Sequence, residues 1–132
     1  MRSININTNA RDELIDITAK VRELVPADMK NGICHVFCMH TTAGITVNEN
    51  CDPDVKHDLI YQLDKLVEWN NPAFKHFEGN SAAHLKASLM GFSLSIPVRD
   101  GALMLGRWQG IYFCEFDGPR SRSLSVQFMV TQ

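Results

Sequence analysis

The stretch that decides the fold is GICHVFCMHTTAGITVNE, residues 32–49. Residues 33–40 are largely apolar on both faces, which predicts a strand that is covered on both sides. Residues 41–44 predict a bend. Residues 45–49 alternate strictly between apolar and polar side chains, which predicts a second strand. The chain therefore has a β-rich centre, and the flanking segments are interpreted around it.

The N-terminal segment predicts two strands and a helix. Residues 3–8 alternate, and residues 13–17 are rich in isoleucine and leucine, so we expect a second strand that pairs with the first. Thr18 is a good N-cap for a helix over residues 19–25, which Pro26 would end.

A longer helix is predicted to begin after residue 49. Asp52 supplies an N-cap carboxylate, and Pro53 suits the first helical position. Apolar side chains then recur at spacings of four, four and three, which predicts a core-facing stripe. The residues of this stripe are Val55, Leu59, Leu63 and Leu66.

A long connection, residues 69–79, separates that helix from a shorter one. Long connections in compact domains are often functional. Asn80 or Ser81 would cap the third helix, which runs to about Met90 and ends at Gly91. Its predicted core face consists of Leu85, Leu89 and Phe92.

The remaining chain predicts strands over residues 93–99, 102–105, 110–116 and 123–130, with Asp100-Gly101 as a hairpin turn. The total is seven or eight strands and three helices. We therefore expect one α+β domain over residues 1–132. Helices on one side would leave a sheet face in need of cover, which predicts a homo-oligomer.

Composition narrows the class of protein. The chain has 132 residues, 45% of them hydrophobic and 21% charged, with a net charge of -2, so a general nucleic-acid-binding surface is not expected. The first residues resemble no signal peptide, and no apolar run is long enough to span a membrane. These features predict a soluble cytoplasmic protein.

The cysteines are not predicted to carry chemistry. Cys34 and Cys38 would lie about 13 Å apart on one strand face, too far to share a metal ion or a disulfide. With Cys51 and Cys114 they are interpreted as buried, reduced thiols.

Two segments place histidine beside small or hydroxyl side chains. His40 precedes Thr41 and Thr42 at a strand end, and histidine can act as acid, base or metal ligand. The alternative is an ordinary strand end followed by a threonine-rich turn. His84 falls in the first turn of the third helix, where a neutral ring is favoured.

The start of that helix is also a candidate phosphate site. Asn80 and Ser81 stand where backbone N–H groups are unpaired, and Lys86 adds a cation nearby in sequence. The alternative is a capped helix with a surface histidine.

Two further segments are candidates for ligand binding. Trp108 and Gln109, flanked by glycines, could stack on a ring and read its polar edge. Glu115 and Arg120 belong to a run of carboxylates and arginines, residues 115–122, that could hold Mg²⁺ and a diphosphate. A hairpin turn and a solvated charged turn are the respective alternatives. No Gly-rich nucleotide fingerprint occurs, so no organic cofactor is expected.

Taken together, these segments resemble the YjbQ-like family of secondary thiamine-phosphate synthases over nearly the whole chain. The matching motifs are the His-Thr-Thr motif at residues 40–42 leading to Asn48-Glu49-Asn50, the run at residues 83–88, the Gly-x-Trp-Gln segment at residues 106–109, and residues 113–120. Arg107 departs from the family's threonine, and Ala82 stands where another polar residue is often expected.

The resemblance implies a two-sheet β-sandwich that assembles as a homotrimer. It also implies a transferase that joins hydroxymethylpyrimidine diphosphate to a thiazole phosphate and releases pyrophosphate. The alternative is a module that binds a metal or a small phosphorylated metabolite without catalysis, so whether the protein is an enzyme stays open.

Under the transferase interpretation, His40, His84, Glu49 and Glu115 are the catalytic candidates. The two histidines could also ligate a metal, with Mg²⁺ or another divalent ion such as Zn²⁺ as cofactor. If residues 33–40 and 44–49 form a tight hairpin, Glu49 lies opposite Val36 and about 13 Å from His40. Glu49 would then reach the site only across a subunit boundary, or not at all.

Overall fold

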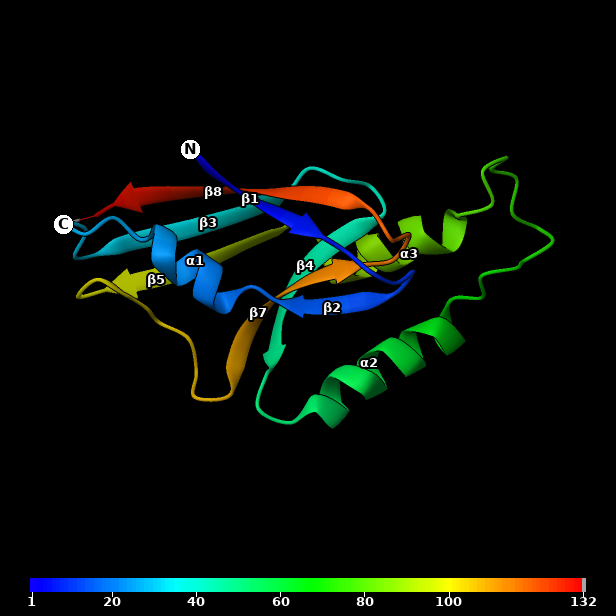
Figure 1. Ribbon diagram of the computed structural model, residues 1–132, viewed down its shortest axis with the longest axis horizontal. Helices are drawn as coiled ribbons and strands as arrows, with labels where there is room; N and C mark the ends of the chain where they lie inside the picture. Colours follow the sequence, from blue (N-terminus) through cyan, green and yellow to red (C-terminus); the bar gives the residue numbers. More distant parts are fainter. Residues whose placement is uncertain (132) are drawn as a thin grey trace.

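The computed structural model describes residues 1–131 and contains, within them, eight strands and three helices (Figure 1). The elements in chain order are β1 (Arg2–Asn7), β2 (Glu13–Asp16), α1 (Thr18–Leu24), β3 (Gly32–Cys38), β4 (Ala43–Glu49), α2 (Pro53–Leu66), α3 (Ser81–Met90), β5 (Ser93–Arg99), β6 (Ala102–Leu103), β7 (Gln109–Glu115) and β8 (Ser121–Val130).

The strands form two antiparallel sheets, which confirms the α+β sandwich. One sheet has five strands in the order β1-β8-β3-β5-β6, and the other has three in the order β2-β7-β4. Helices α2 and α3 pack on the three-stranded sheet, α2 against β2 and α3 against β4 and β7 (Figure 1). The longest of the three helices, α2, has 14 residues, and none within residues 1–131 is long and apolar enough to cross a membrane.

The predicted pairing of the first two strands is wrong. Ile4 of β1 lies opposite Leu124 of β8, whereas Leu14 of β2 lies opposite Cys114 of β7. The segment between β1 and β2 passes from one sheet to the other, so each strand turns its apolar side chains toward the interior from its own layer. Alternation along a strand shows that it is half-buried, but it does not name the partner strand.

Strands β3 and β4 also belong to different sheets and do not form a hairpin. Strand β3 pairs with β5 and β8, and β4 pairs with β7. Residues 39–42 therefore cross between the layers. Glu49 lies opposite Gln109 rather than Val36.

Strand β3 is covered on one face only, contrary to the prediction. Cys34, Val36 and Cys38 are buried, whereas Phe37 between them is 42% exposed. Met129 of β8, on the same outer face, is 57% exposed. Within residues 1–131, α2 and α3 do not cover the apolar side chains of this face, because both helices pack on the other sheet.

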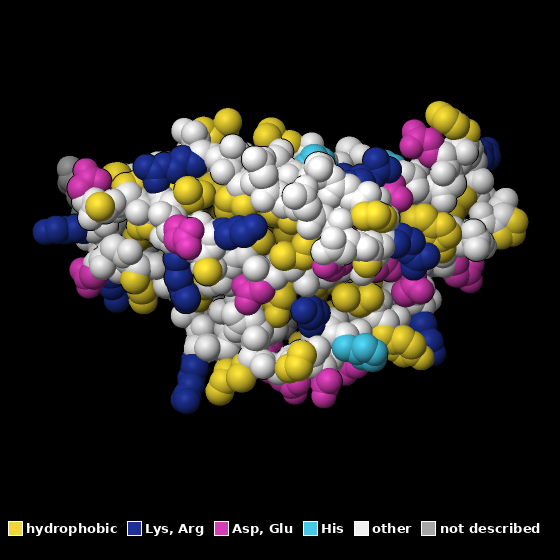
Figure 2. Space-filling model, viewed as in Figure 1, with side chains coloured by type: hydrophobic (Ala, Val, Ile, Leu, Met, Phe, Trp, Pro, Cys, Tyr) yellow, Lys and Arg dark blue, Asp and Glu magenta, His cyan; other side chains and the backbone are white. Residues whose placement is uncertain are grey.

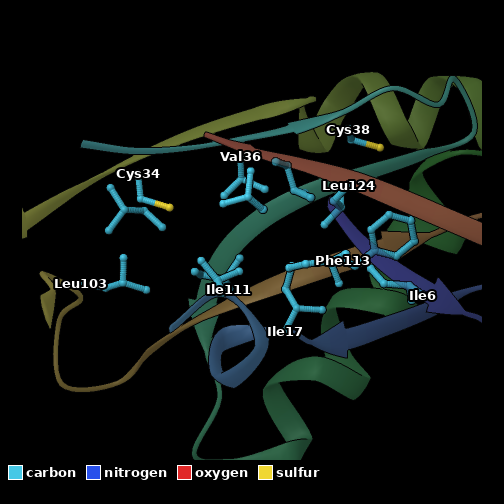
Figure 3. Packing of buried hydrophobic residues seen from close by; sticks show 14 of the residues in the cluster. Ile6, Ile17, Cys34, Val36, Cys38, Leu103, Ile111, Phe113 and Leu124 are labelled. Carbon is cyan, nitrogen blue, oxygen red and sulfur yellow. The ribbon is translucent and has the colours of Figure 1, made fainter. Parts of the chain in front are cut away.

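The main core lies between the two sheets. Val36 and Leu124 point from the five-stranded sheet toward Ile111 and Phe113 of β7, and Ile17 fills the space beside them (Figure 3). All five side chains are fully buried. Their removal from water is the main favourable contribution to the stability of this region.

Helix α2 begins as predicted, but its apolar stripe is largely uncovered. Asp52 Oδ1 accepts a hydrogen bond from the Asp54 amide at 2.9 Å, and Pro53 is the first helical residue. Only Leu63 of the stripe is buried, and Leu66 is 68% exposed. The helix contacts the sheet mainly through β2, so Val55 and Leu59 are only partly buried.

The predicted core face of α3 is also wrong. Leu85 and Leu89 are 47% and 63% exposed, and Phe92 is only partly buried. The buried residues of the helix are Ala82, Ala83, Lys86 and Ala87.

Close packing explains why small residues face the sheet there. A Cβ placed on Gly44 of β4 would lie 2.6 Å from the Gly91 carbonyl oxygen and 3.1 Å from that of Ala87. Leucine side chains would hold the helix farther away, so alanine and glycine form this interface.

The C-terminal end of α3 and the β5–β6 turn agree with the sequence. Gly91 follows α3 with φ 99°, a conformation that favours glycine. Asp100 and Gly101 have φ 51° and 79°, as a two-residue hairpin turn requires.

Charged side chains are scattered over the surface. On the face shown in Figure 2, Lys and Arg side chains alternate with Asp and Glu, and neither sign gathers into one continuous patch. Three of the four cysteines are buried, and Cys51 is exposed, contrary to the prediction for that residue. Burial raises the pKa of Cys34 to about 11 and that of Cys114 to about 12, so both thiols stay protonated near neutral pH.

Candidate functional site

A pocket of about 310 Å³ lies where three connections meet at one end of the sandwich. These are the crossing from β3 to β4, the connection from β7 to β8, and the long segment that leads into α3 (Figure 1). Its lining residues are Thr41, Thr42, His76, Glu78, Asn80, His84, Asp117, Arg120 and Arg122.

The floor of the pocket is a buried ion pair. Arg122 Nε donates to Glu115 Oε2 at 2.8 Å, and its Nη2 donates to Glu115 Oε1 at 2.5 Å. The same Nη2 lies 2.8 Å from Thr42 Oγ1. Arg122 is 7% exposed and Glu115 is fully buried. A bidentate pair of this kind holds the guanidinium in one orientation.

Three further donors satisfy the Glu115 carboxylate. Thr8 Oγ1 donates to Oε2 at 2.9 Å, and the backbone amides of Phe116 and Asp117 donate to Oε1 at 3.0 and 2.9 Å. Burial by itself raises the pKa of Glu115, but the hydrogen bonds and charge of Arg122 and the Asp117 amide outweigh it and hold the pKa below its ordinary value. Glu115 is therefore an ionised anchor for Arg122.

A second arginine is anchored at the side of the pocket. Arg120 Nη2 donates to Asp117 Oδ2 at 2.9 Å, and Arg120 Nε donates to the Asp117 carbonyl at 2.8 Å. Asn80 Nδ2 donates to the same Asp117 Oδ2 at 2.8 Å. The Arg120 side chain is 50% exposed, so part of its donor capacity faces solvent and the pocket.

Two histidines and a carboxylate form the rim. The rings of His76 and His84 meet edge to face with centroids 5.5 Å apart. His76 Nε2 lies 3.8 Å from Glu78 Oε1, and both residues come from the segment before α3. His84 sits in the first turn of α3, as the sequence predicted.

His40 lies behind the pocket wall and does not line it. Its Nε2 is 3.1 Å from both the backbone nitrogen and the carbonyl oxygen of Ser123. The ring therefore contacts β8 just beyond the last paired residues of β3 and β8, Cys38 and Leu124. Burial, reinforced by the nearby charge of Arg122, lowers the pKa of His40 below its ordinary value. The ring is therefore neutral near pH 7.

Lys86 is fully buried and does not reach the pocket. Its Nζ lies 3.1 Å from Asp12 Oδ2 and 2.9 Å from Asp64 Oδ1. Arg11 also pairs with both carboxylates. This cluster joins α3, α2 and the β1–β2 connection.

Four more predicted residues are not brought to the pocket. Ser81 begins α3 but is not among the lining residues. Gln109 stands at the start of β7, six residues or about 20 Å from Glu115. Its Oε1 accepts from the Gly106 amide at 2.7 Å. Trp108 and Glu49 lie at that same far end, beside Gln109 and opposite it.

Metal ligation by the two predicted histidines has limited support in the geometry. Within residues 1–131, no group of three His, Cys, Asp or Glu side chains is placed to hold a metal ion. Of the two histidines, only His84 lines the pocket. A zinc centre built from three or four protein ligands does not fit these side chains.

The structure adds four lining residues to the predicted set: His76, Glu78, Asp117 and Arg122. Asp117 and Arg122 lie in the charged run at residues 115–122, where the sequence singled out Glu115 and Arg120. His76 and Glu78 lie in the long connection at residues 69–79, whose length was the only signal for them. Charge and length marked the segments, but only the packing selects the side chains.

Fold and pocket define an α+β sandwich with a small, mixed-charge pocket built on loops at one end. Comparison with known proteins identifies its family: the chain belongs to the family described as UPF0047 protein YjbQ-like, whose model matches residues 2–131. The chain is 48% identical over 130 residues to UPF0047 protein YugU of Bacillus subtilis, with 98% of each chain covered. It is 50% identical over 127 residues to UPF0047 protein MJ1081 of Methanocaldococcus jannaschii, covering 94% of this chain and 90% of that protein.

Solved structures agree with the fold. An uncharacterized conserved protein of the YjbQ/UPF0047 family from Clostridium acetobutylicum superposes with a TM-score of 0.95 at 49% identity, covering 98% of this chain and all of that one. A YbjQ-like protein of unknown function from Sulfolobus solfataricus has a TM-score of 0.93 at 35% identity, with 98% and 96% of the two chains covered.

Proposed function

We propose that the pocket binds a small phosphorylated metabolite and that the protein is a transferase acting on a diphosphate ester. The observation that supports this most directly is the pair of arginines, Arg120 and Arg122, that line one pocket with the Thr42 hydroxyl. Guanidinium groups suit phosphate oxygens because they donate two parallel hydrogen bonds.

The anchoring carboxylates favour catalysis as well as binding. Glu115 and Asp117 orient the two guanidinium groups before any ligand arrives. Donors that are already oriented need no rearrangement when negative charge develops on a leaving group. Glu115 is thus a positioning residue in this proposal.

The reaction we propose is the one that the resemblance to secondary thiamine-phosphate synthases implies. The thiazole nitrogen bonds to the methylene carbon of hydroxymethylpyrimidine diphosphate as the carbon–oxygen bond to the diphosphate breaks. The electron pair of that bond leaves with pyrophosphate. Arg120 and Arg122 stabilise the charge on the departing oxygens, and His84 on the rim donates a hydrogen bond to them.

Mg²⁺ would fit this pocket together with the substrate's phosphates. Mg²⁺ usually binds through one or two carboxylates together with substrate phosphates, and Asp117 and Glu78 are the two carboxylates in the lining. Mg²⁺ bound there with the substrate would neutralise part of the diphosphate charge. The proposed roles of the arginines and His84 do not depend on it.

A binding module without catalysis is the second candidate. Two of the four predicted catalytic groups have structural partners elsewhere, because Glu115 holds Arg122 and His40 Nε2 contacts the Ser123 backbone. A third, Glu49, lies at the far end of β4. These positions favour recognition of a phosphate by the pocket over proton transfer by those residues.

The test is pyrophosphate release from hydroxymethylpyrimidine diphosphate and thiazole phosphate with Mg²⁺. We expect release that requires both substrates and that falls about 100-fold in His84→Ala. His57→Ala, which removes an exposed histidine on α2, is the matched control and should keep the wild-type rate. A wild-type rate equal to the blank would remove the transferase proposal, and calorimetric binding of pyrophosphate would then support the binding module.

We also propose that the protein is a homotrimer. The support is the apolar outer face of the five-stranded sheet, where Phe37 and Met129 are 42% and 57% exposed. Sedimentation equilibrium should give three times the chain mass of 14.9 kDa. A mass of one chain at micromolar concentration would exclude it.

A further inference from the structure

Asn80 has a buried acceptor without a partner in the protein. The residue is 7% exposed, and among the described residues 1–131 no donor reaches its Oδ1. Bulk water does not compensate, because Oδ1 has almost no accessible surface. A buried acceptor left unpaired is costly, so such atoms commonly mark a position that a ligand completes.

The orientation of the amide is determined by its neighbour. Asn80 Nδ2 donates to Asp117 Oδ2 at 2.8 Å. Rotating the amide by 180° would place Oδ1 against that carboxylate oxygen, two acceptors facing each other. The hydrogen bond to Asp117 therefore fixes which of the two amide atoms is Nδ2 and which is the unpaired acceptor Oδ1.

Asn80 does not cap α3 with its side chain. It is the N-cap residue of α3, yet its side chain accepts no hydrogen bond from the first turn of the helix. Its side chain bonds instead to Asp117, and both residues line the pocket together with Arg120 and Arg122. The side-chain amide thus bonds to a pocket residue and not to the first turn of the helix.

The ligand must therefore present two kinds of group. Arginines attract its phosphate oxygens, but a fully ionised phosphate cannot donate to Oδ1. A cation held by protein side chains alone does not fit, because no three His, Cys, Asp or Glu side chains of the described chain are grouped to hold one. Mg²⁺ shared between Oδ1, a pocket carboxylate and the ligand's phosphate is the alternative that the experiment below separates. A neutral amino or hydroxyl group of an organic ligand fits better.

From this geometry we infer that Asn80 determines specificity, by accepting a hydrogen bond from an amino or hydroxyl group beside the ligand's phosphate. The inference rests on the proposed function, because it assumes that the arginines hold that phosphate.

The experiment compares two diphosphates by calorimetry: hydroxymethylpyrimidine diphosphate with its 4-amino group, and the analogue with hydrogen there. We expect the amino compound to bind wild-type protein about tenfold more tightly or better. In Asn80→Leu, which has similar volume and no acceptor, the ratio of the two affinities should fall to about one. Asn80→Ser, whose side chain ends short of Oδ1, replaces it if circular dichroism shows that the leucine variant does not fold.

Each other outcome overturns the inference in a distinguishable way. A wild-type ratio of one with intact pyrophosphate binding removes it and leaves the proposed function standing. Failure of both organic diphosphates and of pyrophosphate to bind removes the inference and the proposed function together. A large ratio that persists in the variants means that another residue reads the donor. If Mg²⁺ strengthens wild-type pyrophosphate binding and Asn80→Leu abolishes that dependence, Oδ1 holds a cation instead.

Discussion

Two buried cations of this protein look alike in sequence and differ in what they do. Lys86 and Arg122 are both shielded from solvent, and each is paired with carboxylates. Lys86 joins α3 to Asp12 and Asp64 and has no surface on the pocket. Arg122 joins β8 to Glu115 and Thr42 and forms part of the pocket floor.

The difference shows that burial and pairing do not by themselves identify a functional cation. Both clusters hold elements together, and both would be costly to break. They differ in position: Arg122 lines the pocket, whereas the ammonium group of Lys86 contacts Asp12 and Asp64 and does not line it. The following predictions test that separation, from the largest expected effect to the smallest.

Replacing Arg122 should have the largest effect. Arg122→Met leaves the Glu115 carboxylate buried without its guanidinium, so the free energy of unfolding should fall by about 3–5 kcal/mol. Pyrophosphate binding should also be lost. Urea denaturation and calorimetry measure the two effects, with Arg99→Met on an exposed strand position as control. Unchanged binding in a folded variant would place the ligand elsewhere.

Replacing Lys86 should cost stability without affecting binding. Lys86→Met removes a buried partner of Asp12, but Arg11 remains and Asp64 is half exposed, so we expect a loss of about 1–3 kcal/mol. Affinity for pyrophosphate should stay at the wild-type value. Lys20→Met, on the exposed side of α1, serves as control in the same urea series. Weakened pyrophosphate binding in Lys86→Met would show that Lys86, like Arg122, contributes to the binding site.

The two clusters should also differ in their response to acid. The pKa of Glu115 is held below 4.5 in the folded protein, so its ionised form contributes stability that is complete above that value. This contribution is lost as pH falls toward the lower folded pKa. Hydrogen bonds from Lys86 lower the pKa of Asp64 as well, but that carboxylate is half exposed.

Stability measured between pH 6 and pH 3 should therefore depend less steeply on pH in Glu115→Gln than in Asp64→Asn. The comparison uses the slope and not the absolute stability, since Glu115→Gln also weakens the ion pair with Arg122. Equal slopes in the two variants would mean that the pKa of Glu115 is lowered no more than that of Asp64.

The smallest effect is expected at the far end of β7. Trp108 is 52% exposed and lies at the opposite end of β7 from Glu115, so Trp108→Ala should change the affinity for pyrophosphate by less than about twofold. Titration calorimetry measures it. A tenfold loss would show that Trp108 reaches the ligand, which within this chain it does not.

Local pattern was a good guide to the elements of this protein. Alternation located the strands, Asp52-Pro53 located the start of α2, and Gly91 the end of α3. It was a poor guide to helix faces, because Leu85 and Leu89 stay exposed while alanines face the sheet. Hydrophobicity favours leucine in a core, but the close approach of α3 to Gly44 leaves no room for it.

The site was predicted as segments rather than as side chains. The sequence marked the His-Thr-Thr crossing, the start of α3 and the charged run after β7, and these three meet at the pocket. It did not show that Arg122 lines the pocket and Lys86 does not. Nor did it show that Asp117 lines the pocket while Glu115 lies behind it as the partner of Arg122. Which face of an element a charged group occupies depends on the partner strand, and that partner is distant in the chain.

The amino-acid sequence by itself determined the strands and helices, the α+β class, and the segments where polar chemistry concentrates, because turn, cap and alternation preferences act over a few residues. Only the tertiary structure decided the sheet order, the pocket and the free Asn80 oxygen. Those depend on contacts such as Asn80 with Asp117 and Thr42 with Arg122, separated by 37 and 80 residues. Such contacts form only when the two sheets close on their shared core, and no local pattern records them.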